Sequence, residues 1–448
     1  GGEPNESNGV ARLGFVGGFD GVRGIGILLV LTQHAYPLLF PSVAGIIDVF
    51  FVMSAFLIVS LLLQEHRSLH DINMRRFYAR RALRLLPSAY LCLLAWVVVS
   101  LLFDRDRLVW VLQDAAAAVT YVYNLVFPVG IEAVDPQAAS QRSIDQFWSL
   151  AVEEQFYLMV AVTVLVCIRK RWITQLAVVM VAIATYIGLA RLFGQTGPWP
   201  GGPTNSSVPA RGLSLLWLSR PDSLMWGVAL AVLNARLPDP LPEKWRVWLP
   251  RAGAVGLVVA GTTMLLGSPF LHDLASRANV PHLFFPMAPH DGVDDGALYW
   301  IKFGHTLTAL ACMPALLAMV RTKDWWGNRG LSWKPLRFLG RMSYTLYVWH
   351  ALPFIILMAV IGGDDPSLGV QLLRTPILIA AAFLVSMPVY YLVELPVLRM
   401  KLRFSAEPEA LDLTTGKMVP TGEAAEGDGA APAPGRDGAP GEPGAPTG

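Results

Sequence analysis

The stretch AGIIDVFFVMSAFLIVSLLL (44–63) decides the fold class, because it holds a single ionisable side chain, Asp48, among its 20 residues. A helix needs about 20 predominantly apolar residues to cross the hydrocarbon core of a bilayer. Nine further stretches are long and apolar enough to do the same, at 21–40, 85–103, 148–168, 173–193, 213–234, 248–268, 300–320, 339–361 and 371–396. The sequence therefore predicts an all-α fold, a polytopic membrane helix bundle with about ten transmembrane helices.

The composition agrees with this prediction and excludes other classes of protein. Of 448 residues, 54% are hydrophobic and only 15% are charged, whereas soluble domains are about 25% charged. A net charge of +2 provides no basic surface of the kind that binds nucleic acid, so no nucleic-acid partner is expected. The three cysteines lie inside apolar runs without metal-ligand spacing, so we expect neither a disulfide nor a metal site.

Three segments differ from the ten predicted spans. An eleventh stretch, 108–127, contains Gln113, Asp114 and Asn124, and we interpret it as an interfacial or re-entrant helix. Residues 1–20 are polar and are predicted to form a cytoplasmic N-terminal segment, followed by a membrane domain over 21–403. Residues 404–448 are rich in Gly, Ala, Pro and acidic residues and are predicted to form a disordered cytoplasmic tail.

Basic residues divide unevenly between alternate connections of the predicted bundle. The connections 64–84, 169–172, 235–247, 321–338 and 397–403 contain 20 Lys and Arg residues, whereas 104–147, 194–212, 269–299 and 362–370 contain five. Lys and Arg concentrate in cytoplasmic loops. We therefore expect a multi-pass protein of the plasma membrane with both termini in the cytoplasm.

Ionisable side chains inside a bilayer are costly and are functional candidates by default. At about 1.5 Å per helical residue, six such residues from four predicted helices fall in one layer of the outer half: His34, Asp48, Glu153, Glu154, Arg220 and Asp222. A structural ion pair is as good an interpretation as function for any single member. A shared layer that contains a histidine favours function. Adjacent helical residues point about 100° apart, so we expect one of Glu153 and Glu154 to face the site and the other to pair with an arginine.

A second set of basic residues lies toward the cytoplasmic side. Arg23 is eleven residues before His34, which places both on one helix face about 16 Å apart. The connection HRSLHDINMRRFYARRALR (66–84) adds five arginines, Arg75, Arg76, Arg80, Arg81 and Arg84. Such a cluster suits anionic lipid headgroups, and guanidinium groups also suit the phosphates of a cytoplasmic cosubstrate.

Seven segments in order resemble the acyltransferase-3 family of bacterial membrane O-acyltransferases. They are FDGVRGIGILLVLTQHA (19–35), DVFFVMSAFLI (48–58), FYARRALRLLPSAY (77–90), WSLAVEEQFYL (148–158), SRPDSLMWG (219–227), LGRMSYTLYVWH (339–350) and VELP (393–396). Arg23 and His34 match the family's basic-x10-His motif. The resemblance implies ten membrane helices, cytoplasmic termini, and transfer of an acyl group from cytoplasmic acyl-CoA to a hydroxyl of an envelope glycan or glycolipid.

The expected mechanism assigns a role to each candidate residue. His34 is the expected general base, because an imidazole titrates near neutral pH, and Glu153 or Glu154 is expected to orient its ring. Arg220 is the candidate partner of an oxyanion or of a substrate carboxylate, held by Asp222, with Asp48 in the same substrate-binding set. Arg23 and the five arginines are expected to bind acyl-CoA, a cosubstrate, and no permanently bound cofactor is expected. His350 is interpreted as a packed histidine.

Several alternatives stay open at this level. The transferred group can be acetyl or succinyl, and the acceptor can be one of several envelope glycans or glycolipids. A proton-coupled transporter that uses the buried charges as a relay is the main alternative, although residues 21–210 and 211–400 show none of the internal repetition common in transporters. A non-catalytic scaffold is a third possibility.

Overall fold

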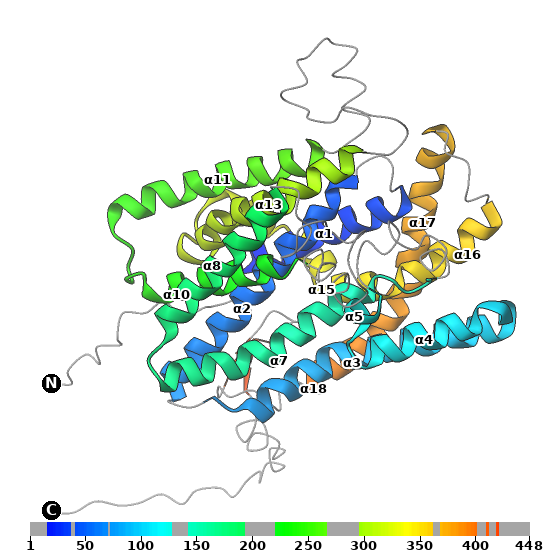
Figure 1. The fold of residues 1–448 in the computed structure, drawn as a ribbon, viewed down its shortest axis with the longest axis horizontal. Helices are drawn as coiled ribbons and strands as arrows, with labels where there is room; N and C mark the ends of the chain where they lie inside the picture. Colours follow the sequence, from blue (N-terminus) through cyan, green and yellow to red (C-terminus); the bar gives the residue numbers. More distant parts are fainter. Residues whose placement is uncertain are drawn as a thin grey trace, which may run out of the picture.

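The computed structural model describes residues 16–36, 41–69, 72–127, 142–192, 220–266, 295–361, 368–400, 409–411 and 418–420. These parts are helical apart from two short strands, and the helices pack into one bundle (Figure 1). The predicted all-α membrane bundle is confirmed. Residues 1–15 of the predicted N-terminal segment 1–20 lie outside the described residues. Helix α1 begins at Gly17, four residues before the predicted span 21–40.

The helices follow one another with short connections. The first part of the chain forms α1 (Gly17–Ala35), η1 (Pro41–Gly45), α2 (Ile46–Leu69), α3 (Met74–Phe103), η2 (Arg105–Arg107), α4 (Leu108–Val119), α5 (Tyr123–Val126), α7 (Phe147–Arg169) and α8 (Ile173–Leu192). The second part forms α10 (Pro221–Arg236), α11 (Glu243–Leu266), α13 (Asp295–Arg321), α14 (Trp326–Leu331), α15 (Lys334–Trp349), α16 (Ala351–Ile361), α17 (Leu368–Val389), the π-helical turn η4 (Tyr390–Glu394) and α18 (Leu395–Met400).

Seven helices in the described residues are long and apolar enough to cross a membrane, or eight if the bent pair α15 and α16 forms one span. The seven are Ser42–Arg67, Met74–Phe103, Phe147–Arg169, Ile173–Leu192, Glu243–Leu265, Phe303–Arg321 and Gly369–Met400. Together with the bent pair α15 and α16, these seven helices correspond to eight of the ten predicted spans. The stretch 108–127 forms α4 and α5, and α4 has 12 residues, which is too short for a span.

The predicted count of ten is not confirmed, because two segments do not meet the length and composition expected of a span. The segment 21–40 corresponds to α1, which carries five glycines as well as Asp20, Arg23 and His34. The segment 213–234 corresponds to α10, a helix of 16 residues that begins at Pro221. Residues 213–219 lie outside the described residues.

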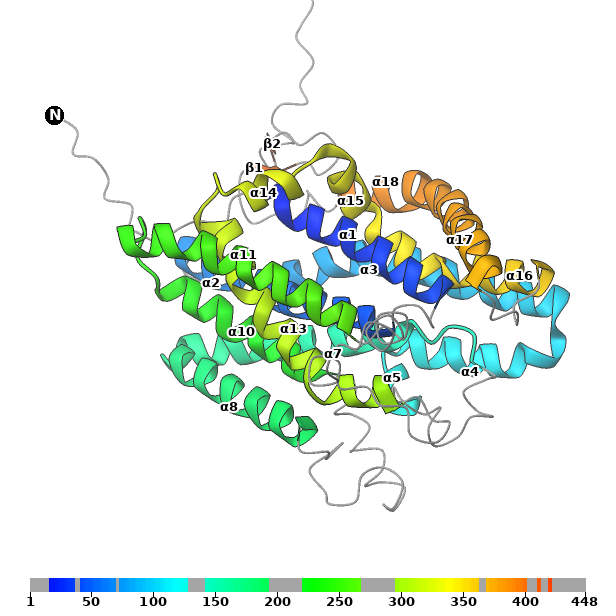
Figure 2. The ribbon, with the colours of Figure 1, turned by 90° about the horizontal axis from the view of Figure 1, so that it is seen from above.

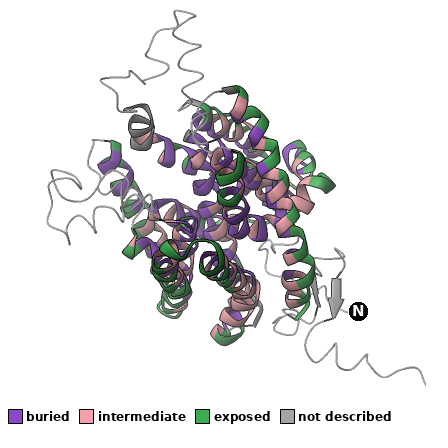
Figure 3. Ribbon diagram, turned by 90° about the vertical axis from the view of Figure 1, so that its right-hand side faces the viewer, coloured by how far each residue is buried: buried purple, intermediate pink, exposed green. Residues whose placement is uncertain are grey.

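The core of the bundle surrounds α2, whose most apolar window is 72% buried, whereas the span made by α17 and α18 is only 22% buried. Helix α10 packs along α2 and α8, and α11 packs along α13. Buried positions gather inside the bundle and exposed ones on its outer helices (Figure 3). Most of the exposed side chains on the peripheral helices are large and apolar, as expected of a surface that faces lipid tails.

Helix α1 lies alongside α15 (Figure 2) at a distance that only glycine permits. A Cβ atom at Gly340 would collide with the carbonyl of Asp20, and one at Gly24 would collide with the carbonyl of Leu336. Small residues let membrane helices approach closely. This crossing sets α1, with Arg23 and His34, directly against α15.

A break between α15 and α16 bends the chain by 60° at His350. The turn before the break is fixed from two other helices. The Val348 carbonyl accepts hydrogen bonds from Gln146 Nε2 at 3.2 Å and from Cys92 Sγ at 3.3 Å, and Trp349 Nε1 donates to Ser88 Oγ at 3.2 Å. The break is therefore held in place by α3 and by the start of α7.

Two short strands, β1 (Glu409–Leu411) and β2 (Met418–Pro420), pair in an antiparallel manner. They fall within the stretch 404–448 that the sequence predicts to be disordered. The other residues of that stretch lie outside the described residues, so disorder there stays a prediction.

Candidate active site

His34 lies one residue before the end of α1 and is partly buried. Its Nδ1 lies 2.9 Å from the carbonyl oxygen of Val30, one turn earlier on the same helix. A carbonyl oxygen can only accept, so this contact places the ring proton on Nδ1. The other nitrogen, Nε2, then carries a lone pair, which is the form of imidazole that can take up a proton.

The ring beside His34 belongs to His350, at the break between α15 and α16. The two ring centroids are 4.8 Å apart and the ring planes are inclined by 67°. His350 Nδ1 lies 2.7 Å from the carbonyl oxygen of Tyr347, which places its ring proton on Nδ1 by the same argument. His350 is fully buried, and its Nε2 has no hydrogen-bond partner among the residues that the structure describes.

The structure does not place Glu153 or Glu154 as the partner that orients His34. Glu154 forms an ion pair with Arg81 of α3 at 3.2 Å. Glu153 accepts a hydrogen bond from Ser54 of α2 and interacts electrostatically with Arg23 and Arg81. The Arg81–Glu154 pair confirms the expectation that one of the two glutamates pairs with an arginine. No contact among the described residues joins either glutamate to His34, so the expectation that one of them orients the His34 ring stays a prediction.

Glu153 and Glu154 lie deeper in the bundle than the sequence predicted relative to Arg220. Trp148, near the start of α7, packs against Arg220, and Glu153 and Glu154 lie five and six residues further along α7, about 8–9 Å deeper. The single layer expected from the sequence therefore separates into two. The glutamates join a middle layer with Arg81, whose guanidinium lies 3.3 Å from the ring centroid of Tyr157. The Tyr157 hydroxyl is hydrogen bonded to Ser54.

The five arginines of the predicted donor-binding cluster occupy different environments. Arg75 and Arg76 are exposed at the start of α3 and have no carboxylate partner among the described residues. Arg80 pairs with Glu65 of α2 at 3.2 Å, and Arg81 pairs with Glu154. Arg84 lies deeper and acts electrostatically on Asp20.

Asp20 is surrounded by guanidinium groups from three helices. Arg23 of α1, Arg84 of α3, and Arg337 and Arg341 of α15 all act on its carboxylate. We call these five residues the inner basic cluster. Burial raises the pKa of Asp20 above its usual range, and the four arginines act against that rise. Four cations around one carboxylate leave an excess of positive charge at the end of α1 opposite to His34. The sequence did not indicate that Arg337 and Arg341 join this cluster, although Arg337 lies two residues before the motif that contains His350 and Arg341 lies inside that motif.

The outer ionisable residues form a separate network among α2, α10 and α13. Arg220 Nη1 lies 3.0 Å from the Ala44 carbonyl and 3.5 Å from Asp48 Oδ2. Asp48 also accepts hydrogen bonds from Ser223 Oγ at 2.8 Å and from His305 Nδ1 at 2.7 Å. Arg220 and Asp48 are 5% and 0% exposed. Arg220 adopts a left-handed backbone conformation, with φ of 56°, which a residue with a side chain adopts at a cost of about 1–3 kcal/mol when its surroundings impose it.

Asp222 does not hold Arg220, contrary to the sequence-based expectation. It pairs with Arg191 of α8, which also donates to Thr306 Oγ1 at 2.9 Å. The carboxylate that holds Arg220 is Asp48. Arg220 is the left-handed residue directly before α10, whereas Asp222 lies in the first turn of that helix. Their side chains therefore point in different directions. The role of His305 beside Asp48 was also missed.

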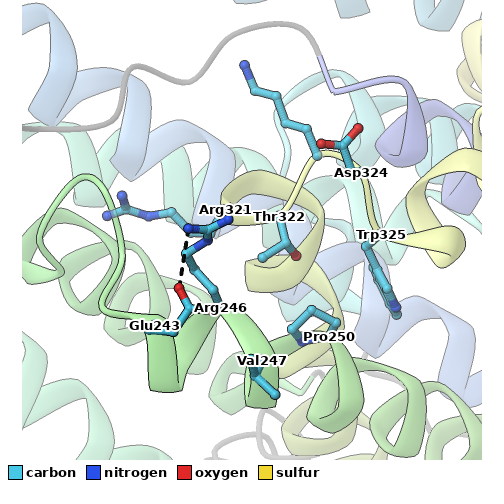
Figure 4. A pocket seen from close by; sticks show the side chains of 9 residues that line it. Glu243, Arg246, Val247, Pro250, Arg321, Thr322, Asp324 and Trp325 are labelled. Carbon is cyan, nitrogen blue, oxygen red and sulfur yellow. Dashed lines mark hydrogen bonds and ion pairs between the residues drawn. The ribbon is translucent and has the colours of Figure 1, made fainter.

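A pocket of about 450 Å³ lies between α11 and the connection from α13 to α14 (Figure 4). Its lining includes Arg246, Arg321, Lys323 and Trp325, and Glu243 pairs with Arg246 across part of it at 3.4 Å. It contains none of the predicted site residues. Within the described part of the chain, no group of three or more His, Cys, Asp or Glu side chains is arranged to hold a metal. His272, His282 and His290 lie outside that part.

Comparisons with known proteins identify the family of this chain. The family model described as an acyltransferase domain matches residues 16–392, which include every helix from α1 to α17. The chain belongs to the acyltransferase-3 family. No solved structure matches it.

Curated relatives of this acyltransferase-3 chain carry names that refer to acetyl transfer. It is 29% identical over 352 residues to the putative peptidoglycan O-acetyltransferase YrhL of Bacillus subtilis, which covers 77% of the chain and 49% of the relative. It is 26% identical over 391 residues to the peptidoglycan O-acetyltransferase OatA of Listeria monocytogenes, which covers 86% of the chain and 56% of the relative. A putative O-acetyltransferase of Staphylococcus aureus, SACOL0978, is 27% identical over 345 residues, 76% of the chain and 50% of the relative. The chain spans about half the length of these relatives.

Proposed function

We propose that this acyltransferase-3 chain is a membrane O-acyltransferase that moves an acetyl group from cytoplasmic acetyl-CoA to a hydroxyl of an extracytoplasmic envelope glycan. The family supports the reaction class, and the names of the relatives favour acetyl as the group and peptidoglycan as the first acceptor to test. Succinyl is the alternative acyl group, and a glycolipid is the alternative acceptor.

The single observation that carries the proposal is the state of His34. Its Nδ1–H is bound to the Val30 carbonyl at 2.9 Å, so Nε2 is the nitrogen left to accept a proton. A general base works best when its pKa lies near the working pH, and among side chains imidazole has an ordinary pKa close to neutral pH. We assign His34 the role of base.

The donor end of the proposal rests on the inner basic cluster. Arg23 lies on the face of α1 that also carries His34, about 16 Å away along the helix. Four guanidinium groups around Asp20 favour the phosphates of acetyl-CoA, and exposed Arg75 and Arg76 extend this charge to the start of α3. The acyl arm would then lie along α1 with its thioester at His34.

The transfer step balances with one base. His34 Nε2 takes the proton of the acceptor hydroxyl as the hydroxyl oxygen forms a bond to the acyl carbon. The carbon–sulfur bond of the thioester breaks, and the proton passes from His34 to the departing sulfur. The products are the glycan ester and free CoA, and His34 returns to its starting state.

The other predicted site residues have supporting roles in this proposal. Glu154 pairs with Arg81 in the middle of the bundle, and Glu153 interacts electrostatically with Arg81 and Arg23. Arg220 and Asp48 neutralise one another and are almost fully buried, so they hold α2 and α10 together, as Asp222 holds α8 through Arg191. Direct contact of these three residues with the acceptor has no support in the described contacts.

The test is mass spectrometry of envelope glycans, beginning with muramidase digests of peptidoglycan, from a strain that lacks the gene. We expect an O-acetylated species to disappear, to return with the wild-type gene, and to stay absent with His34→Gln expressed at the same level in the membrane. An unchanged acylation pattern in the deletion strain would remove envelope glycans as acceptors. Restoration by His34→Gln would remove His34 as the base.

A further inference from the structure

His350 is a buried histidine that the proposed transfer step does not use. It is 0% exposed and its Nδ1–H is bound to the Tyr347 carbonyl at 2.7 Å. Within the described part of the chain, its Nε2 has no hydrogen-bond partner. A buried acceptor without a donor costs about 1–3 kcal/mol. Retaining an imidazole at a site where an apolar ring would fit needs a reason.

The neighbour of the unsatisfied ring is His34. The two rings meet edge to face with centroids 4.8 Å apart. His350 also contacts Tyr347 and Phe354, with centroid separations of 6.0 Å and 5.5 Å. Neither of those rings carries a charge at neutral pH, so the His34 ring is the contacting group whose charge the proposed step changes.

The surroundings of His350 keep its ring in one place. The break between α15 and α16 is fixed by hydrogen bonds from Gln146 and Cys92 to the Val348 carbonyl, and Tyr347 is bound to Ser149 at 2.6 Å. A His350 ring that is held in this way keeps the same edge-to-face contact with His34 throughout a reaction cycle. Preorganised dipoles of this kind stabilise charge that develops during a reaction.

Two imidazoles in contact cannot both become positively charged without strong repulsion. His350 is the more deeply buried of the two, and burial disfavours its charged form. His34 therefore takes the proton, and His350 stays neutral.

We propose that His350 is a positioning residue for His34, which holds the His34 ring in its reactive orientation and stabilises the positive charge that this ring acquires during acyl transfer. The proposal rests on the function proposed above, in which His34 Nε2 accepts the hydroxyl proton. His350 keeps its own proton on Nδ1 throughout, so the balance of the transfer step is unchanged.

The experiment uses the purified full chain in detergent, with acetyl-CoA as donor and soluble peptidoglycan fragments as acceptor. His350→Phe keeps a ring of similar size without nitrogen atoms, and His350→Gln places an amide near the position of Nε2. Trp349→Phe is the matched control, because it removes a buried hydrogen bond to Ser88 one residue away. We expect His350→Phe to lower kcat about tenfold or more with both KM values within about twofold. His350→Gln should recover part of the loss, and Trp349→Phe should leave kcat within about twofold.

A double variant separates positioning from structural damage. If His350 acts through His34, then His350→Phe should have no further effect on the residual rate of His34→Gln. A structural defect would multiply the two losses. The proposal is overturned if His350→Phe matches Trp349→Phe in kcat, or if the two losses multiply. If His350→Phe does not fold, as judged by its thermal unfolding, the same comparison is made with His350→Leu, which also lacks ring nitrogen atoms.

The outcome for His34 distinguishes failure of this inference from failure of the proposed function. If His34→Gln is inactive and His350→Phe behaves as Trp349→Phe, only the role of His350 is wrong. If His34→Gln keeps wild-type kcat, His34 is not the base and both proposals fall.

Discussion

The bundle contains two clusters of buried polar side chains that differ in how far they are satisfied. In the outer network, Asp48 takes contacts from Arg220, Ser223 and His305. In the histidine pair, His34 Nδ1 and His350 Nδ1 are bound to carbonyls of their own chain segments, and the described residues provide no hydrogen-bond partner for His350 Nε2. Ion pairs hold helices together in the first cluster, whereas proton-accepting nitrogens are left available in the second.

This difference is the basis on which we propose a chemical role for the histidine pair and a structural role for the outer network. A buried ion pair whose groups neutralise one another has no remaining capacity for a substrate, and removing one partner leaves an uncompensated charge. A buried nitrogen with a free lone pair is a cost to folding that function can explain. Mutations in the two clusters should therefore separate stability from activity.

The largest effect is expected at His34. His34→Ala should lower the rate of acyl transfer by about 10²–10⁴-fold, the usual contribution of a general base, while membrane insertion and thermal unfolding stay close to wild type. Turnover of acetyl-CoA by purified protein and the midpoint of thermal unfolding measure the two effects. A variant with near wild-type turnover would contradict the distinction between the clusters.

The next largest effect is expected in the outer network, and on stability. Asp48→Ala leaves the 5% exposed Arg220 without its carboxylate, which should cost about 3–5 kcal/mol of folding free energy. Glu243→Ala is the matched control, because its pair with Arg246 is 79% and 62% exposed and should contribute about 0–1 kcal/mol. Equal losses in denaturation of the two variants would show that the outer network does not hold the bundle together.

A smaller effect on donor binding should distinguish the paired from the unpaired arginines of α3. Replacing exposed Arg75 and Arg76 by Gln should raise the KM for acetyl-CoA about tenfold, without changing the KM for the acceptor or the unfolding midpoint. Replacing Arg80 and Arg81 should weaken donor binding more than acceptor binding and should also lower stability, because both are in ion pairs with Glu65 and Glu154. Equal changes in the two KM values would indicate that these arginines only set membrane topology.

The smallest effect concerns Asp20 and pH. Because burial raises the pKa of Asp20, the folded state binds this proton more tightly than the unfolded chain does. The contribution of Asp20 to stability is full below about pH 4, its unfolded pKa, and falls as the pH rises through the raised value. Asp20→Asn should therefore unfold at a higher temperature than wild type at pH 7, and the difference should shrink toward pH 4. Asp324→Asn, whose side chain is 98% exposed, should show no such difference. If the stabilisation by Asp20→Asn grew as the pH was lowered, it would contradict a raised pKa of Asp20 in the folded state.

The sequence predicted the bundle and most of its spans, because long apolar runs such as 44–63 admit few other structures. It also predicted membrane spans at α1 and α10, neither of which meets the length and composition expected of a span. Apolar length does not reveal that α1, with its glycines, is covered by α15, since that coverage depends on the close approach at Gly24 and Gly340.

The candidate site was predicted only in part. Spacing along one helix correctly related Arg23 to His34, because both lie on α1. Depth estimates could not pair residues on different helices. They did not show that Glu154 pairs with Arg81, or that Arg220 pairs with Asp48 instead of Asp222. The predicted span 213–234 also began eight residues before the start of α10 at Pro221. The contact between His34 and His350 depends on the break at the end of α15, and no helical periodicity indicates such a break.

The most direct test of the central claim is side-resolved acyl transfer in vesicles of uniform orientation. Labelled acetyl-CoA is supplied only on the side of the inner basic cluster, and soluble peptidoglycan fragments are supplied only on the other side. We predict that label reaches the glycan with the wild-type chain and not with His34→Gln. Transfer by His34→Gln at the wild-type rate, or transfer only when donor and acceptor share one side, would contradict a base at His34 that is supplied from the cytoplasmic face.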